Sequence, residues 1–184
     1  MSKSKGRTAP VTSADAHSSA AVIAHTYVRL RGDQDGSITV HHARTETARV
    51  TLRWGSVLMT FHNAEAAQGV LEGFSAARNT LMWVPAEVRP AEPDPYDQPT
   101  IAVEWTRRPS YAVMPREKVA IDKRTKLMWT DIYMGPLTFQ VLDRAAFHSA
   151  TELLREAHRT TVAVCLDGGK FRADPTRDDY EPQK

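Results

Sequence analysis

The sequence predicts an α+β fold made of two copies of one unit, in which a four-stranded antiparallel sheet is followed by one helix. Three observations predict it: several short segments alternate apolar and polar residues, two longer segments have the apolar period of an amphipathic helix, and both halves of the chain show these patterns in the same order. We place the first unit at residues 21–84 and the second at residues 100–166.

In the first unit, alternation or β-branched content indicates strands at residues 24–31, 38–42, 49–54 and 57–61. Asp35-Gly36 supplies typical turn chemistry between the first two. Asn63 is a typical N-cap, and it opens a helix. The apolar face of this helix consists of Ala67, Val70, Leu71, Phe74 and Leu81.

The second unit repeats this plan, with strands near residues 101–107, 111–121, 127–134 and 137–142. Asp143 caps its helix, and placing Asn63 on Asp143 aligns the two helices without a gap. A short apolar run follows each helix, and we interpret the second run, residues 161–166, as a strand. The alternative is a single irregular α+β sheet without a duplication.

Three segments are predicted to lie outside these units. Residues 1–20 have no periodic apolar pattern and indicate a disordered tail. Residues 85–99 contain five prolines and four acidic residues, which favours a linker. Residues 167–184 contain Gly168-Gly169 near their start and are rich in charge, so we expect a second disordered tail.

The composition is that of a globular protein, with 41% hydrophobic and 25% charged residues. No apolar run approaches the length that crosses a bilayer, which predicts no membrane contact. The single cysteine, Cys165, excludes an internal disulfide and fits a cytoplasmic protein. Frequent alanine and arginine suggest a bacterial source with a GC-rich genome.

One predicted sheet face is basic and partly aromatic. If the apolar residues of the first unit face its helix, the opposite face carries Tyr27, Arg29, Arg31, His41, Arg49 and Arg53. Arginines can neutralise phosphates, and a tyrosine on a strand can stack on an unpaired base. The alternative is a solvated face, which an antiparallel sheet commonly has.

A second basic cluster falls near the predicted turn of one hairpin. Arg116 and Lys118 precede this turn, and Lys123, Arg124 and Lys126 follow. These side chains could hold a phosphate backbone, or they could be an ordinary solvated turn.

The repeated order of four strands and one helix resembles the topology of the Whirly and PUR-type folds. The resemblance lies in the order of elements and not in a sequence motif. It implies a binding module, either for single-stranded nucleic acid or for a protein.

The sequence contains no pattern of a catalytic nucleophile, a phosphate loop or a set of metal ligands, so we predict no enzyme, metal or cofactor. His41 and His42 are adjacent on a predicted strand and point to opposite faces. We therefore predict a non-enzymatic accessory or regulatory protein that binds single-stranded DNA or RNA. The alternative is a protein-interaction or developmental-regulatory module, and either is compatible with a homo-oligomer.

Overall fold

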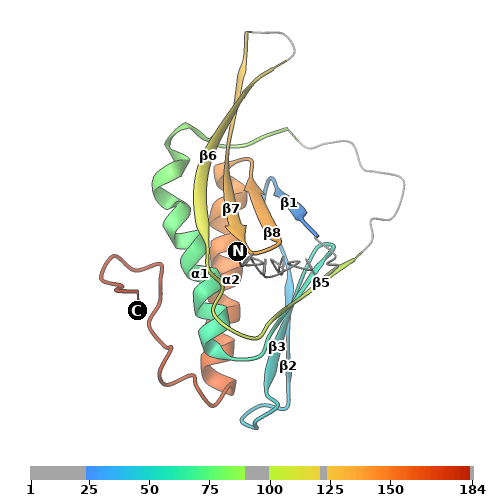
Figure 1. Cartoon of the computed structure of the whole chain (residues 1–184), viewed down its shortest axis with the longest axis vertical. Helices are drawn as coiled ribbons and strands as arrows, with labels where there is room; N and C mark the ends of the chain where they lie inside the picture. Colours follow the sequence, from blue (N-terminus) through green and yellow to red (C-terminus); the bar gives the residue numbers. More distant parts are fainter. Residues whose placement is uncertain (1–23, 90–99, 121–123, 183–184) are drawn as a thin grey trace, which may run out of the picture.

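The computed structural model describes residues 24–89, 100–120 and 124–182, and within them the fold is α+β, with two four-stranded sheets and two α-helices (Figure 1). The first half of the chain contributes β1 (Thr26–Leu30), β2 (Ser37–His41), β3 (Arg49–Trp54), β4 (Val57–Phe61), α1 (Ala64–Ala76) and the 3-10 helix η1 (Ala77–Trp83). The second half contributes β5 (Ile101–Trp105), β6 (Ala112–Val119), β7 (Lys126–Met134), β8 (Leu137–Val141) and α2 (Arg144–Val164).

Each half of the chain gives its first strand to the sheet of the other half. β1 lies parallel to β8 in a sheet with the order β1-β8-β7-β6, which we call sheet A. β5 lies parallel to β4 in a sheet with the order β2-β3-β4-β5, which we call sheet B. The α+β class is confirmed, but both sheets are mixed, so the prediction of one antiparallel sheet for each half is wrong. Alternation shows which face of a strand is buried and does not identify its neighbour.

The two exchanged strands occupy equivalent positions. β1 pairs in register with β8 from its first residue to its last, and β5 pairs in the same way with β4. The amide of Thr26 donates to the carbonyl of Pro136 over 2.8 Å, and the amide of Ile101 donates to the carbonyl of Ser56 over 2.8 Å. Pro136 and Ser56 each end the turn that joins the last two strands of their half. The two halves therefore share one strand register.

Turn and cap residues also correspond between the halves. Gly55 and Gly135 precede β4 and β8 with φ values of 55° and 62°, a conformation that glycine adopts without steric cost. The side chains of Asn63 and Asp143 accept a hydrogen bond from the amide three residues on, over 2.7 and 2.8 Å. Both predicted N-caps are confirmed.

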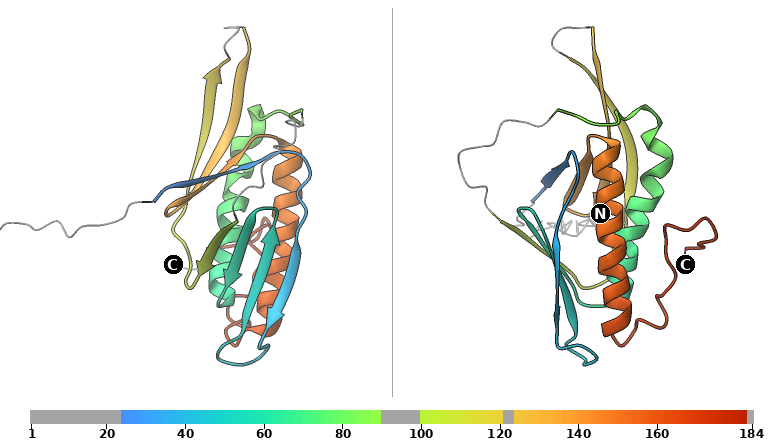
Figure 2. Two further views of the ribbon diagram at one scale, coloured as in Figure 1. Left: turned by 90° about the vertical axis from the view of Figure 1, so that its right-hand side faces the viewer. Right: turned by 180° about the vertical axis from the view of Figure 1, so that it is seen from behind.

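The two halves bury one common hydrophobic core. β6 and β7 of sheet A contact α1, β2 and β3 of sheet B contact α2, and the two helices pack side by side (Figure 2). At the centre, the ring of Phe139 lies 5.9 Å from that of Trp54 and 5.2 Å from that of Phe74, measured between centroids. Since these rings come from both sheets and from α1, neither half buries its apolar surface without the other.

The ends of the two helices differ from each other. α1 passes into the tighter η1 at Ala77, where the hydroxyl of Thr80 donates to the carbonyl of Ala77 over 2.7 Å. α2 continues to Val164, so the prediction of a strand at residues 161–166 is wrong. A short apolar run is compatible with either structure, because periodicity cannot separate a buried strand from the end of a helix.

The C-terminal segment, residues 167–182, lies against both helices, which corrects the prediction of a disordered tail (Figure 1). The carboxylate of Asp167 accepts hydrogen bonds from the first two amides of α1, over 2.9 and 3.1 Å. Phe171 is 6% exposed, and its carbonyl accepts hydrogen bonds from His158 Nε2 over 2.8 Å and from Gln68 Nε2 over 3.2 Å. His148 and His158 lie ten residues apart, which is not a spacing that brings two ligands together and predicts surface histidines, but His158 is buried beneath this segment.

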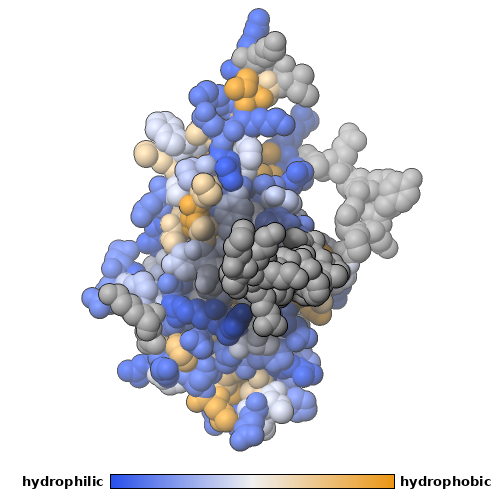
Figure 3. Space-filling view, in the orientation of Figure 1, coloured by the Kyte–Doolittle hydropathy of each residue, from blue (hydrophilic) through white to orange (hydrophobic). Residues whose placement is uncertain are grey.

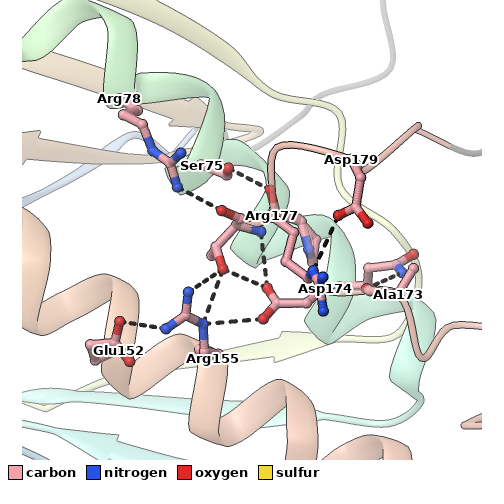
Figure 4. Close-up of polar contacts among 11 residues, drawn as sticks. Ser75, Arg78, Glu152, Arg155, Ala173, Asp174, Arg177 and Asp179 are labelled. Carbon is pink, nitrogen blue, oxygen red and sulfur yellow. Dashed lines mark hydrogen bonds and ion pairs between the residues drawn. The ribbon is translucent and has the colours of Figure 1, made fainter.

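A second group of polar contacts holds the end of this segment (Figure 4). Arg155 Nε on α2 lies 3.2 Å from the carboxylate of Asp174, and it donates to the hydroxyl of Thr176 over 3.0 Å. From α1 and η1, Ser75 donates to the carbonyl of Pro175 over 2.6 Å, and Arg78 donates to that of Thr176 over 2.7 Å. Side chains of the helices thus satisfy the backbone of a segment that has few apolar residues of its own.

The predicted N-terminal tail and residues 90–99 of the predicted linker lie outside the described residues. Residues 83–89, which we call the strap, run past the start of α2. The amide of Arg144 donates to the carbonyl of Pro85 over 2.9 Å, and the amide of Val88 donates to the carboxylate of Asp143 over 3.0 Å. The strap is therefore fixed to α2.

Cutting the chain between its halves should not separate them, because they share a core and exchange strands. We expect a protein with a specific protease site inserted between Glu92 and Pro93 to elute as one species after cleavage and to unfold in one transition. Size-exclusion chromatography and thermal denaturation measure this, and the same sample in denaturant gives the separated fragments as a control. Release of two folded fragments under native conditions would contradict the exchanged pairing.

His158 should make stability depend on pH. Burial lowers the pKa of His158 below its ordinary value of 6.5, because the charged ring loses hydration. The unfolded chain therefore binds more protons than the folded chain near and below pH 6.5, and the free energy of unfolding should fall as the pH falls through this range. Denaturant unfolding at about pH 7.5 and about pH 5.5 measures the difference.

The control for this prediction lies on the same helix. The His158→Gln variant should lose most of this pH dependence, whereas the variant of the exposed His148, His148→Gln, should keep it. Equal pH dependence in the wild type and in His158→Gln would show that another group is responsible.

Candidate nucleic-acid interface

The outer face of sheet A is the side turned away from the core. Alternate residues of its strands, such as Val28, Ile132 and Phe139, belong to or pack against the hydrophobic core, so their neighbours point outward. Across the strands, the register gives three rows of outward residues: Tyr27, Thr138, Tyr133 and Ala112; then Arg29, Gln140, Asp131 and Met114; then Trp129 and Arg116.

A fully hydrogen-bonded carboxylate, Asp131, lies at the centre of this face. Its Oδ1 accepts from Trp129 Nε1 over 2.8 Å and from Gln140 Nε2 over 3.1 Å. Its Oδ2 accepts from Arg116 Nε over 3.1 Å and from the hydroxyl of Tyr133 over 3.1 Å. Asp131 is only 4% exposed, so it orients four side chains and offers little free acceptor surface to a ligand.

The β1 edge of this face carries a guanidinium beside an exposed ring. Arg29 Nε donates to Gln140 Oε1 over 3.1 Å, which extends the hydrogen-bonded row from Asp131 to the edge of the sheet. Tyr27 is 56% exposed, and its ring centroid lies 4.6 Å from that of His25. This edge can therefore offer a cation and a flat aromatic surface to the same ligand.

The β6 edge adds further positive charge. Hydrogen bonds with Tyr133 and Asp131 raise the pKa of Arg116 above its usual value, so its guanidinium stays charged. Lys118 lies two residues after Arg116 on the same strand, so it points to the same face, and it is exposed. Among the described residues of sheet A, the only acidic side chain on this face is the hydrogen-bonded Asp131, and the face is therefore net positive.

The basic face predicted from the sequence is divided between the two sheets. Tyr27 and Arg29 lie on the outer face of sheet A, and Arg31 follows the end of β1. The other predicted residues, His41, Arg49 and Arg53, lie on the outer face of sheet B. The two sheets cover different sides of the helix pair (Figures 1 and 2), so the prediction of one shared face is wrong. The physical reason is the transfer of β1 to the other sheet.

The predicted basic turn belongs to the β6–β7 hairpin, which projects beyond the rest of sheet A (Figure 2). Lys123 lies outside the described residues. Arg124 precedes β7 and Lys126 begins it, and Lys126 Nζ lies 3.3 Å from the carboxylate of Glu117 on β6. The turn thus adds to the positive end of sheet A.

A pocket of about 540 Å³ opens beside the outer face of sheet A. Arg29 and Gln140 border it, and its apolar walls come from the strap and from β7. The wall residues include Trp83, Pro85, Val88, Leu127, Met128 and Trp129. Hydrophobic side chains are visible on the projecting hairpin amid a largely hydrophilic surface (Figure 3).

Two of the tryptophans differ from expectation. Trp129 stands among apolar residues in the sequence, which predicts a place in the core, and Trp83 lies just before the predicted linker, which predicts a contact between the two halves. Trp129 instead lies on the outer face, where it donates to Asp131, and Trp83 is 67% exposed at the pocket. The alternation of Trp129, Asp131 and Tyr133 along one strand was the available signal for this face.

A second cluster of polar side chains, around Glu72, connects α1 to neighbouring segments of the chain. Glu72 on α1 accepts hydrogen bonds from Arg108, from the hydroxyl of Tyr111 over 3.0 Å and from the hydroxyl of Tyr180 over 2.9 Å. These contacts tie α1 to the segment before β6 and to the C-terminal segment. Burial raises the pKa of the Cys165 thiol to about 11, so it is a poor nucleophile at neutral pH.

In residues 24–89, 100–120 and 124–182, no group of three or more histidine, cysteine or acidic side chains could hold a metal ion. In the same part of the chain, no helix is both long and apolar enough to cross a membrane. The chain matches no protein-family model, no curated protein and no solved structure. The candidate interface therefore stands on its own geometry.

Removing the carboxylate of Asp131 should destabilise sheet A. The Asp131→Ala variant leaves the indole of Trp129 and the amide of Gln140 without their acceptor. A fully buried donor without a partner costs about 1–3 kcal/mol, and we expect a loss near the lower end of that range because both donors are half-buried. Denaturant unfolding measures the loss. The control variant Glu104→Gln alters an exposed pair with His62 and should change stability by less than about 0.5 kcal/mol. Equal effects of the two variants would contradict a structural role for Asp131.

Proposed function

We propose that the chain binds single-stranded nucleic acid on the outer face of sheet A, as a non-enzymatic accessory or regulatory protein. The observation that carries this proposal is the exposed ring of Tyr27 beside Arg29 on one edge of the sheet, with Arg116 and Lys118 near the opposite edge. The one carboxylate between these edges, Asp131, already has four donors.

Sheet B provides an internal comparison that favours sheet A. Since the two halves share one register, Tyr27 and Arg29 on β1 correspond to Ala102 and Glu104 on β5. The exposed edge of sheet B therefore has a methyl group and a carboxylate where sheet A has a ring and a guanidinium. Glu104 repels a phosphate, and Ala102 offers no surface for stacking.

The chemistry of this face suits a single-stranded nucleic acid more than a duplex. A base can stack on Tyr27 only when it is free of its pairing partner, and the guanidinium of Arg29 can meet the neighbouring phosphate. The face consists of β-strands. Within the described chain, no helix lies on this face that could enter a groove of a duplex. The order of elements, which resembles Whirly and PUR-type folds, supports a binding role in general.

A protein partner is the second candidate function. Exposed apolar side chains favour it: Met82 and Trp83 are 73% and 67% exposed, and Val119 and Leu127 on the projecting hairpin are about half exposed. Salt separates the candidates, because phosphate binding weakens steeply as salt rises and an apolar interface responds little.

Binding of a labelled single-stranded oligonucleotide, followed by fluorescence anisotropy at several salt concentrations, tests the proposal. Arg29→Gln should weaken binding and reduce the salt slope by about 0.7, the value for one phosphate contact on a single strand. Tyr27→Ala should cost about 1–3 kcal/mol of binding free energy and leave the slope unchanged, because stacking involves no ion release.

Sheet B supplies the control. Arg53→Gln removes an exposed arginine from the outer face of that sheet and should leave both affinity and slope unchanged. An effect of Arg53→Gln equal to that of Arg29→Gln would refute the assignment to sheet A. No binding by the folded wild type at low salt, with the protein at tens of micromolar, would refute the proposed function.

A further inference from the structure

We propose that the free edge of β7 beside the pocket binds an extended acidic peptide of a partner protein, which adds to sheet A as a further strand. This site goes beyond the proposed function, since it uses the backbone of the projecting hairpin and not the stacking surface at Tyr27. The two sites meet where Arg29, Gln140 and Trp129 of the outer face also line the pocket.

Part of one edge of β7 is unpaired within the described chain. β8 pairs with β7 only as far as Val141 opposite Thr130, and the chain then turns into α2 at Asp143. Residues 126–129 of β7 pair with β6 on one side. On the other side, no backbone hydrogen bond joins them to any described segment. Within the described chain, alternate amides and carbonyls of this edge can therefore pair with an added strand.

The pocket runs along this edge. Thr125 through Trp129 form one wall, and Trp83, Pro85 and Val88 of the strap form the other. A strand in this position presents its side chains alternately to the two faces of the sheet. Every other side chain of the peptide therefore meets an apolar wall, and Trp83 loses its unfavourable contact with water.

The lining of the pocket is positively charged. The described residues that line the pocket include two cations, Arg29 and Lys126, and no acidic side chain. The partner of Lys126 is the exposed Glu117 on the neighbouring strand, and such surface pairs exchange easily. The pocket therefore favours a peptide that carries aspartate or glutamate among its apolar residues.

The opposite edge of the hairpin does not have these features. β6 is the outer strand there, and its Pro115 has no amide to donate to an added strand. A proline on an edge strand is a common protection against unwanted pairing. The β7 edge has no proline in residues 126–129. The row of free backbone groups also favours a peptide over a nucleic acid, which offers no matching row of donors and acceptors.

The test selects peptides from a random nonapeptide library displayed on phage against the full chain, with the Trp83→Ala protein as counter-selection. We expect the selected peptides to alternate apolar with acidic residues. The tightest peptide is then synthesised with N-methyl groups on either set of alternate backbone amides. One set should abolish binding and the other should leave it unchanged, because only one side of an added strand faces β7.

Protein variants locate the site. Trp83→Ala and Arg29→Glu should each weaken the synthetic peptide by about tenfold or more, as for residues central to an interface. The matched controls are Met82→Ala, an equally exposed neighbour outside the pocket, and Arg49→Glu on sheet B. If Trp83→Ala does not fold by circular dichroism, Leu127→Ala on the other wall replaces it.

Several results would overturn the proposal. The first is a selection that yields no binding peptide. The second is equal binding by both N-methylated peptides, and the third is a peptide whose affinity is the same for the wild type and for every pocket variant. Oligothymidine binding that Trp83→Ala or Leu127→Ala weakens, together with an empty selection, would assign the pocket to nucleic acid instead. The peptide experiment contains no nucleic acid, so the two proposals are tested separately. If no peptide binds, nucleic-acid binding on sheet A is not affected, and if no oligonucleotide binds, peptide binding at the β7 edge is not affected.

Discussion

The exchange of β1 and β5 between the sheets is the constraint on which the rest of this structure depends. Parallel pairing with β8 and β4 draws both halves around one core, where Trp54, Phe74 and Phe139 meet. The same exchange carries Arg29 to Gln140, which lies 111 residues further along the chain. The basic and aromatic surface of sheet A therefore exists only because a strand of the first half completes the sheet of the second.

The two halves use one geometry for different chemistry. In sheet A, a hydrogen-bonded row runs from Arg29 through Gln140 to Asp131. The corresponding row of sheet B consists of Glu104, Thr60 and Thr51, in which the two threonine hydroxyls lie 3.4 Å apart. β7 is also longer than its counterpart β3, and this difference produces the projecting hairpin and its pocket. Matched positions of the two sheets therefore carry different side chains, and within the described chain only sheet A has the projecting hairpin.

Local features of the fold could be predicted from the sequence, whereas long-range pairing could not. Alternation identified Tyr27 and Arg29 as outward residues, and the caps Asn63 and Asp143 located both helices, because these signals are confined to a few neighbouring residues. The partners of Arg29 could not be inferred, since alternation leaves the neighbouring strand undetermined. The C-terminal segment was missed because polar groups such as Arg155 hold it and it has little apolar surface of its own. The role of Asp131 could not be predicted either, because its donors come from three strands whose pairing alternation does not determine.

The most direct test of this account is a nuclear magnetic resonance titration of the isotopically labelled chain with short oligothymidine. Binding to sheet A predicts that the signals of Tyr27, Arg29 and Gln140 shift together and saturate, while those of Thr39 and Arg53 on sheet B remain in place. Shifts confined to sheet B, or spectra unchanged at saturating oligonucleotide, would contradict the claim that the exchanged strand builds the binding surface.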